Sequence, residues 1–243
     1  MYFLVSGEGV GDMGRCQQGT RCESPEFEEG PMAIIVDQLA ESALGYELSH
    51  LDSGLFGFVS ERYLADNRQP ARAQGMLLPG KKKRKETIYY FENARTLALL
   101  AKDKSQEIDA PVVAVLFRDA DGTASAGRGE WEDKRNSMIE GFRAAEFDLG
   151  VAMLTKPKSE AWLLCAVKQN SYQHCAQLEN ESGNDASPNS LKKQLSAALN
   201  GATSKDNINA LLRDKIIDVA QISMPSFDCF KTDLQAAVCK AAV

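Results

Sequence analysis

Two short acidic motifs contain the residues of this chain that are best suited to chemistry. Glu8 and Asp12 belong to a glycine-rich hexapeptide that follows an apolar stretch at the N-terminus. Asp119 and Asp121 follow the apolar run 112–117. Carboxylate oxygens are the ligands that hard divalent cations such as Mg²⁺ prefer. Three or four carboxylates brought together would therefore predict a metal site.

Each motif follows a segment that has the length and the apolar character of a buried strand. Further segments continue an alternation of strands and helices along the chain. The predicted strands are 2–6, 47–51, 111–117 and 149–154, and the predicted helices are 32–42, 86–104, 131–146 and 159–169. This alternation predicts an α/β fold with a mainly parallel, Rossmann-like sheet and helices on both faces. Because such sheets bind ligands at the carboxyl ends of their strands, we expect the carboxylates to meet at one edge.

The organisation of the chain changes after the predicted α/β domain, which covers residues 1–175. Within that domain, residues 52–85 are predicted to form an irregular basic insertion. A polar linker or loop over 176–190 leads to a small helical C-terminal region, 191–243. The helices of this region are expected at 191–199, 205–221 and 226–240, with Ser204 and Ser226 as N-caps.

Composition is that of an ordinary globular protein. Of the 243 residues, 44% are hydrophobic and 26% are charged. No apolar run approaches the roughly 20 residues of a membrane-spanning helix, and residues 1–6 lack the features of a signal peptide. The six cysteines form no C-x-x-C pair. This argues against a zinc site and predicts reduced thiols in a cytoplasmic protein.

The two acidic motifs, in this order, resemble those of the TOPRIM fold, which topoisomerases, bacterial primases and overcoming-lysogenization-defect nucleases share. The segment Lys156–Leu164 resembles the third motif of a TOPRIM-like family of small bacterial proteins. Members of that family often accompany an SMC- or ABC-type ATPase in phage-defence operons. The resemblance covers roughly residues 1–170. It implies a cytoplasmic effector nuclease whose partner ATPase is a separate chain.

For the site itself, the resemblance implies phosphodiester hydrolysis that depends on Mg²⁺ or Mn²⁺. Glu8, Asp12, Asp119 and Asp121 are the implied catalytic residues. Asp119 and Asp121 would be the principal metal ligands, and Glu8 would be a further ligand or the general acid–base. Asp12 would hold a second metal or orient the turn, and Glu160 would complete a second metal position. Alternatively, these carboxylates would cap helices or form turns.

Basic residues are concentrated in one segment, although the chain has a net charge of −6. The predicted nucleic-acid contacts are Arg68, Arg72, Lys81, Lys82, Lys83, Arg84 and Lys85, together with Lys156 and Lys158. A basic loop beside an acidic metal site would recruit the phosphate backbone that the carboxylates repel. A solvated surface loop is the alternative. Trp162 is expected to pack in the core rather than to stack on a base.

Two other functions remain open. Residues 119–123 also match the first motif of haloacid-dehalogenase-like phosphatases, in which the first Asp is the nucleophile. Here that motif lies in mid-chain, and the later spaced pair is Asp214 and Asp218. A non-catalytic sensor or scaffold beside an ATPase would instead use the apolar faces of the C-terminal helices. No P-loop motif occurs, so we do not expect ATP hydrolysis by a P-loop mechanism.

Overall fold

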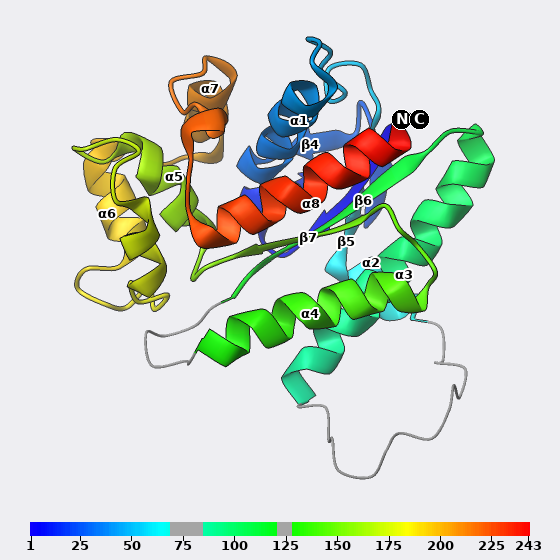
Figure 1. Ribbon diagram of the computed structural model, residues 1–243. Coiled ribbons are helices and arrows are strands. Elements are labelled where there is room, and N and C mark those ends of the chain that lie inside the picture. Colours follow the sequence, from blue (N-terminus) through cyan, green and yellow to red (C-terminus); the bar gives the residue numbers. More distant parts are fainter. Residues whose placement is uncertain (69–84, 121–127) are drawn as a thin grey trace.

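A computed structural model describes residues 1–68, 85–120 and 128–243 of the protein (Figure 1). The main sheet has five strands in the order β3-β5-β1-β6-β7. Their bounds are Arg21–Glu23 for β3, Phe56–Ser60 for β5, Tyr2–Gly7 for β1, Val112–Asp119 for β6 and Gly150–Thr155 for β7. Four strands are parallel, and β3 is antiparallel to β5. The predicted α/β fold with a mainly parallel sheet is confirmed, whereas the TOPRIM assignment stays a prediction.

Helices cover both faces of this sheet. In Figure 1, α8 crosses the sheet beside α1, and α3 and α4 lie on the other side. The helices are α1 (Pro31–Leu44), α2 (Glu61–Asp66), α3 (Lys85–Ile108), α4 (Arg128–Ala144), α5 (Ser159–Val167), α6 (Leu191–Ala198), α7 (Lys205–Arg213) and α8 (Pro225–Ala241). Short helical turns form η1 (Gly9–Met13), η2 (Cys175–Asn180) and η3 (Val219–Gln221), and β2 (Gly14–Cys16) pairs with β4 (Phe27–Glu29).

The two faces follow from the alternation of side chains along each strand. On β6, Val113, Val115 and Phe117 join the core beneath α1 and α8. The intervening residues Ala114 and Leu116 join the core beneath α3 and α4. Continued to the end of the strand, the same alternation turns Asp119 toward the first face and Arg118 toward the second. Two adjacent residues therefore enter different environments.

The C-terminal helices pack on the α/β part of the chain. Helix α8 contacts both α1 and β7. Its anchor is Trp162 on α5, which is fully buried and lies against Phe227 and Phe230 with ring centroids 4.9 and 5.7 Å away. The Trp162 indole N–H donates to Ser226 Oγ at 2.9 Å. The prediction that Trp162 packs in the core is confirmed.

Several predicted elements are wrong. The expected strand over 47–51 is not a strand, and the supposedly irregular stretch 52–85 contains β5 and α2. The helix expected over 205–221 ends at Arg213, because Lys215 adopts a left-handed φ of 55°. Ser204 caps α7 as expected. Ser226 does not cap α8, which has Pro225 at its first position and Met224 as its N-cap.

The cysteines differ most from expectation. Cys16 is bonded to Cys22 and Cys165 to Cys175, with Cα atoms 5.6 and 5.2 Å apart. The turn between β2 and β3 brings Cys16 to Cys22, and the loop that folds back on α5 brings Cys175 to Cys165. Both pairs therefore meet although neither belongs to a C-x-x-C motif. The prediction of reduced thiols is wrong for these four residues. The cytoplasmic location, which it supported, stays a prediction.

None of the helices in the described ranges is long and apolar enough to cross a membrane.

Candidate functional site

The strand order places the two acidic motifs side by side. From β1 the chain passes to β5 on one side and then to β6 on the other, so the order of the parallel strands reverses at the β1–β6 junction. Ligands of open α/β sheets bind outside the carboxyl ends of the strands at such a point. Gly7 pairs with Phe117 there. Glu8 and Asp119 therefore leave neighbouring strands at the same edge.

Asp12 reaches this edge through the turn η1. Gly9 opens the turn with φ of 79°, a conformation that side chains disfavour, and a Cβ at this position would lie 2.7 Å from Asp12 Oδ2. A glycine is therefore required for this approach. Ser159 Oγ, at the start of α5, donates to Asp12 Oδ1 at 2.6 Å.

Asp119 is held by the same serine. Its Oδ1 accepts from the Ser159 backbone N–H at 2.9 Å and from Thr155 Oγ1 at 2.7 Å. Ser159 thus joins the carboxylate at the end of β6 to the carboxylate of η1, using its amide for one and its hydroxyl for the other. Thr155 ends β7 and Ser159 begins α5, so two neighbouring elements hold the Asp119 carboxylate in place.

The electrostatics of this pair are unusual for carboxylates. The pKa of Asp119 is raised to about 8, chiefly by burial; the charges of Asp12 and Glu160 contribute to the rise, and the hydrogen bonds from Thr155 and Ser159 oppose it. Burial also raises the pKa of Asp12 to about 6, with smaller contributions from the charges of Glu160 and Glu8. A bound cation would favour ionisation of both groups.

Glu160 and Lys158 flank the pair at the start of α5. Glu160 lies in the first turn of the helix, where a carboxylate interacts favourably with the helix dipole. Its charge also acts on Asp12 and Asp119, so the structure accommodates both predicted roles. The charge of Lys158 lowers the pKa of Asp12. Lys156 is directed instead to Glu179, with 4.0 Å between Nζ and Oε2.

Glu8 faces away from the serine-linked pair. Its Oε1 accepts from the Asp119 backbone N–H at 3.1 Å, and its Oε2 accepts from the Arg118 guanidinium. In this arrangement an ion pair occupies the carboxylate that was expected to bind metal. Its role as a metal ligand therefore requires a change of partner.

Arg118 is the centre of a second cluster, on the α3 side of the sheet edge. Its Nη1 lies 2.9 Å from Glu61 Oε1, and its guanidinium lies 4.5 Å from the Tyr89 ring and 5.1 Å from the Tyr90 ring. The Tyr89 hydroxyl donates to Glu61 Oε2 at 3.1 Å. Burial tends to lower the pKa of Arg118, but Glu61 and Glu8 outweigh it, so the pKa is raised and the group stays charged.

The chain matches no protein-family model, no curated protein and no solved structure. Its function must therefore be argued from these two clusters.

Several predicted residues lie outside the described part of the chain. Asp121 is one of them, and the basic residues Arg72, Lys81, Lys82, Lys83 and Arg84 are the others. Lys85 begins α3, but its side chain is likewise not described. Arg68 is described: it donates to Asn93 Oδ1 at 3.0 Å and lies 5.1 Å from the Tyr89 ring. One basic residue of the segment therefore reaches the Arg118 cluster.

The donor set suits a hard cation in its chemistry. Asp12, Asp119 and Glu160 offer only oxygen, as Mg²⁺ prefers, and the charge of Glu160 raises the pKa of both aspartates. Within the described residues, however, no three acidic, histidine or cysteine side chains are already grouped as a metal-binding set. The residues fit the cation by type, and Glu8 would have to leave Arg118 to join them.

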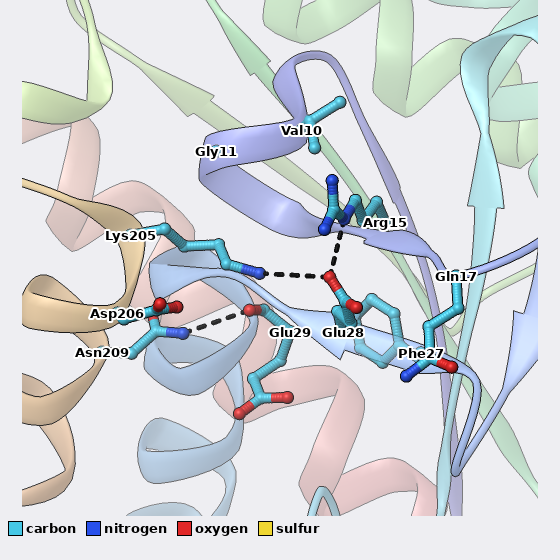
Figure 2. A pocket seen from close by; sticks show the side chains of 10 residues that line it. All are labelled: Val10, Gly11, Arg15, Gln17, Phe27, Glu28, Glu29, Lys205, Asp206 and Asn209. Carbon is cyan, nitrogen blue, oxygen red and sulfur yellow. Dashed lines mark hydrogen bonds and ion pairs between the residues drawn. The ribbon is translucent and has the colours of Figure 1, made fainter.

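An open hollow of about 730 Å³ lies on the outer side of η1. Figure 2 shows Arg15 and Lys205 both directed to the Glu28 carboxylate, at 2.6 and 3.8 Å. Its remaining lining residues are Val10, Gly11, Gln17, Phe27, Glu29, Asp206 and Asn209. Because its two cations pair with one glutamate and two further acids line it, the hollow is poorly suited to a polyanion.

The later spaced pair considered for a phosphatase, Asp214 and Asp218, is divided between the ends of two helical elements. Asp214 ends α7. Asp218 caps η3, where its carboxylate accepts from the Ala220 N–H at 3.0 Å and from the Gln221 side chain at 2.7 Å. The described partners of Asp119 are instead Thr155 and Ser159. Nothing in this geometry favours the phosphatase hypothesis.

Proposed function

We propose that this protein is a metal-dependent nuclease that hydrolyses phosphodiester bonds at the Asp12–Asp119 site. One observation carries the proposal: Ser159 links two carboxylates with raised pKa values at the sheet edge where the strand order reverses. Partly buried acids that disfavour each other's ionisation are typical of a site that receives a cation.

In this proposal Asp119, Asp12 and Glu160 would hold the cation, together with Asp121 and Glu8 as the sequence predicts. A divalent cation at this point would polarise a scissile phosphate and make a water molecule more acidic. Lys158, whose charge already acts on Asp12, would contact a phosphate oxygen. Thr155 and Ser159 would keep Asp119 in one orientation, so that little reorganisation accompanies the reaction.

The wider role is supported by the resemblance of the sequence motifs to TOPRIM-like proteins of phage-defence operons. A cytoplasmic effector nuclease working with a separate SMC- or ABC-type ATPase is the form of the proposal that this resemblance supports. The basic segment that begins at Arg68 would supply contacts to the nucleic-acid backbone. Arg68 belongs to the cluster beside the proposed metal site.

The test is cleavage of plasmid DNA, single-stranded DNA and tRNA with Mg²⁺, Mn²⁺ or EDTA. Asp119→Asn keeps an acceptor for Thr155 and Ser159 but removes the charge, so we expect cleavage to fall by about 10³-fold or more. Asp148→Asn, which alters an exposed aspartate paired with Lys240, is the matched control and should cleave normally. Equal cleavage by wild type and Asp119→Asn would refute the site. Silence toward every substrate would favour a non-catalytic subunit.

A further inference from the structure

The Arg118 cluster contains more carboxylates than its central guanidinium needs. Arg118 is paired with both Glu8 and Glu61, and the three side chains are only 14%, 26% and 18% exposed. A single ion pair would satisfy the charge of the arginine. The second carboxylate adds a like charge in a poorly hydrated place, which is costly unless another cation compensates for it.

The repulsion between the two carboxylates is visible at Glu61. Burial raises the pKa of Glu61, the charge of Arg118 opposes this rise, and the charge of Glu8 adds to it. Arg68 also favours the ionised form, but less than Arg118 does. The charge of Glu8 therefore disfavours the ionised form of Glu61, although both arginines favour it.

Glu61 and the two tyrosines can retain the arginine on their own. Glu61 lies at the first position of α2, next to the cap Ser60, and accepts from the Tyr89 hydroxyl. The Arg118 guanidinium also lies over the Tyr89 and Tyr90 rings. If Glu8 left, Arg118 would keep one ion pair and both ring contacts.

Glu8 is the member of the cluster that can change partner. It lies just beyond β1 and before Gly9, and it is bonded to the Asp119 backbone on one side and to Arg118 on the other. Its charge already acts on Asp12. A rotation of the Glu8 side chain would take its carboxylate from Arg118 toward the serine-linked carboxylates.

We propose that Arg118 is a positioning residue that competes with a divalent cation for the Glu8 carboxylate, with Glu61 retaining the arginine when Glu8 turns to the cation. This inference rests on the proposed metal site. It assigns a role to Arg118 and Glu61, neither of which touches the cation. It makes affinity for the cation depend on a residue on the opposite face of the sheet.

The test is the affinity of the full-length protein for Mn²⁺, measured from the electron paramagnetic resonance signal of free Mn²⁺. Glu61→Gln leaves Arg118 with Glu8 as its one carboxylate, so Mn²⁺ should bind about tenfold more weakly. Adding Arg118→Gln to that variant removes the competitor together with its partner. Affinity should then rise above that of the wild type.

A double-mutant cycle separates exchange from simple electrostatics. In a Glu8→Gln background no carboxylate is left to exchange, so Glu61→Gln should change Mn²⁺ affinity by less than about twofold. If Glu61→Gln acts only through its charge, its effect will be the same in both backgrounds, and the inference is overturned. Thermal unfolding of each variant checks that it is folded.

The outcomes also separate this inference from the proposed function. If the wild-type protein binds Mn²⁺ and cleaves nucleic acid, but Glu61→Gln has the same effect with and without Glu8→Gln, the nuclease proposal stands and the role of Arg118 is refuted. If the wild-type protein binds no Mn²⁺, both the nuclease proposal and the role of Arg118 are refuted.

Discussion

Arg118 and Asp119 are adjacent on β6 but belong to two clusters with opposite electrostatics: one disfavours the charged form of its central residue and the other favours it. On the α5 side, Asp119 joins Asp12 and Glu160, and the pKa values of both aspartates are raised. On the α3 side, Arg118 is surrounded by two carboxylates and two tyrosine rings and remains charged. The first cluster can gain stability from an added cation, whereas the second already contains one. The alternation of a single strand is enough to build both within one sheet edge.

The two clusters should differ most in the stability of the metal-free protein. Replacing the charged residue by a neutral amide should destabilise the protein at Arg118 and stabilise it at Asp119. Arg118→Gln leaves Glu8 and Glu61 without their cation, and removing one partner of a buried ion pair costs about 3–5 kcal/mol. The measurement is urea unfolding in EDTA at neutral pH. A cost below about 1 kcal/mol would show that the guanidinium is not needed to balance these carboxylates.

The pH dependence of stability should come mainly from the α5 side. Asp119 has a folded-state pKa of about 8, well above its ordinary value of 3.8, so the folded protein binds a proton that the unfolded chain has released. Stability in EDTA should therefore fall as the pH rises, by about 3 kcal/mol between about pH 5 and about pH 8. Asp12, with a pKa of about 6, contributes to the lower part of this range. Saturating Mg²⁺ should reduce the slope.

Asp119→Asn should stabilise the metal-free protein while it abolishes cleavage. The amide keeps the acceptor for Thr155 and Ser159 and removes a charge that burial disfavours. We expect a gain of about 3 kcal/mol at about pH 8, seen as a higher melting temperature in EDTA. The gain should vanish at about pH 5, where the aspartate is already protonated. A loss of stability at both pH values would contradict the raised pKa.

The smallest effects should come from removing one hydroxyl on each side. Tyr89→Phe deletes the hydrogen bond to Glu61, and Ser159→Ala deletes the one to Asp12. Each should cost about 1 kcal/mol in stability. Mn²⁺ affinity distinguishes the two variants. Ser159 orients a proposed ligand directly, so Ser159→Ala should weaken Mn²⁺ binding more than Tyr89→Phe does. The reverse order would place the cation on the α3 side.

The sequence predicts the strands β1 and β6 better than it predicts the strand order that brings their ends together. The apolar runs before Glu8 and Asp119 are long and uninterrupted, and both are strands. β5 was missed because it follows Gly54, contains Gly57 and lies within residues 52–85, which were predicted to be irregular as a whole. Its absence from the prediction hid the reversal of strand order, which depends on β5 and β6 lying on opposite sides of β1.

Ser159, Thr155 and Arg118 could not be singled out from the sequence. A serine at a helix start and a threonine at a strand end are common, and their roles appear only when β7 and α5 come beside β6 and η1. An arginine at a strand end is normally solvated. The signal available for Arg118 was the alternation of β6, which turns it to the opposite face from Asp119.

The two tryptophans of the chain are divided between the same two faces. Trp162 belongs to the core beneath α8, and its indole donates to Ser226. Trp131 packs on the α3–α4 side, and its indole donates to the carbonyl of Leu154 at 3.2 Å. Replacing either tryptophan by phenylalanine would leave a single tryptophan, on one face of the sheet. Fluorescence of the two single-tryptophan proteins would then report separately on each side of the sheet as metal or nucleic acid is added.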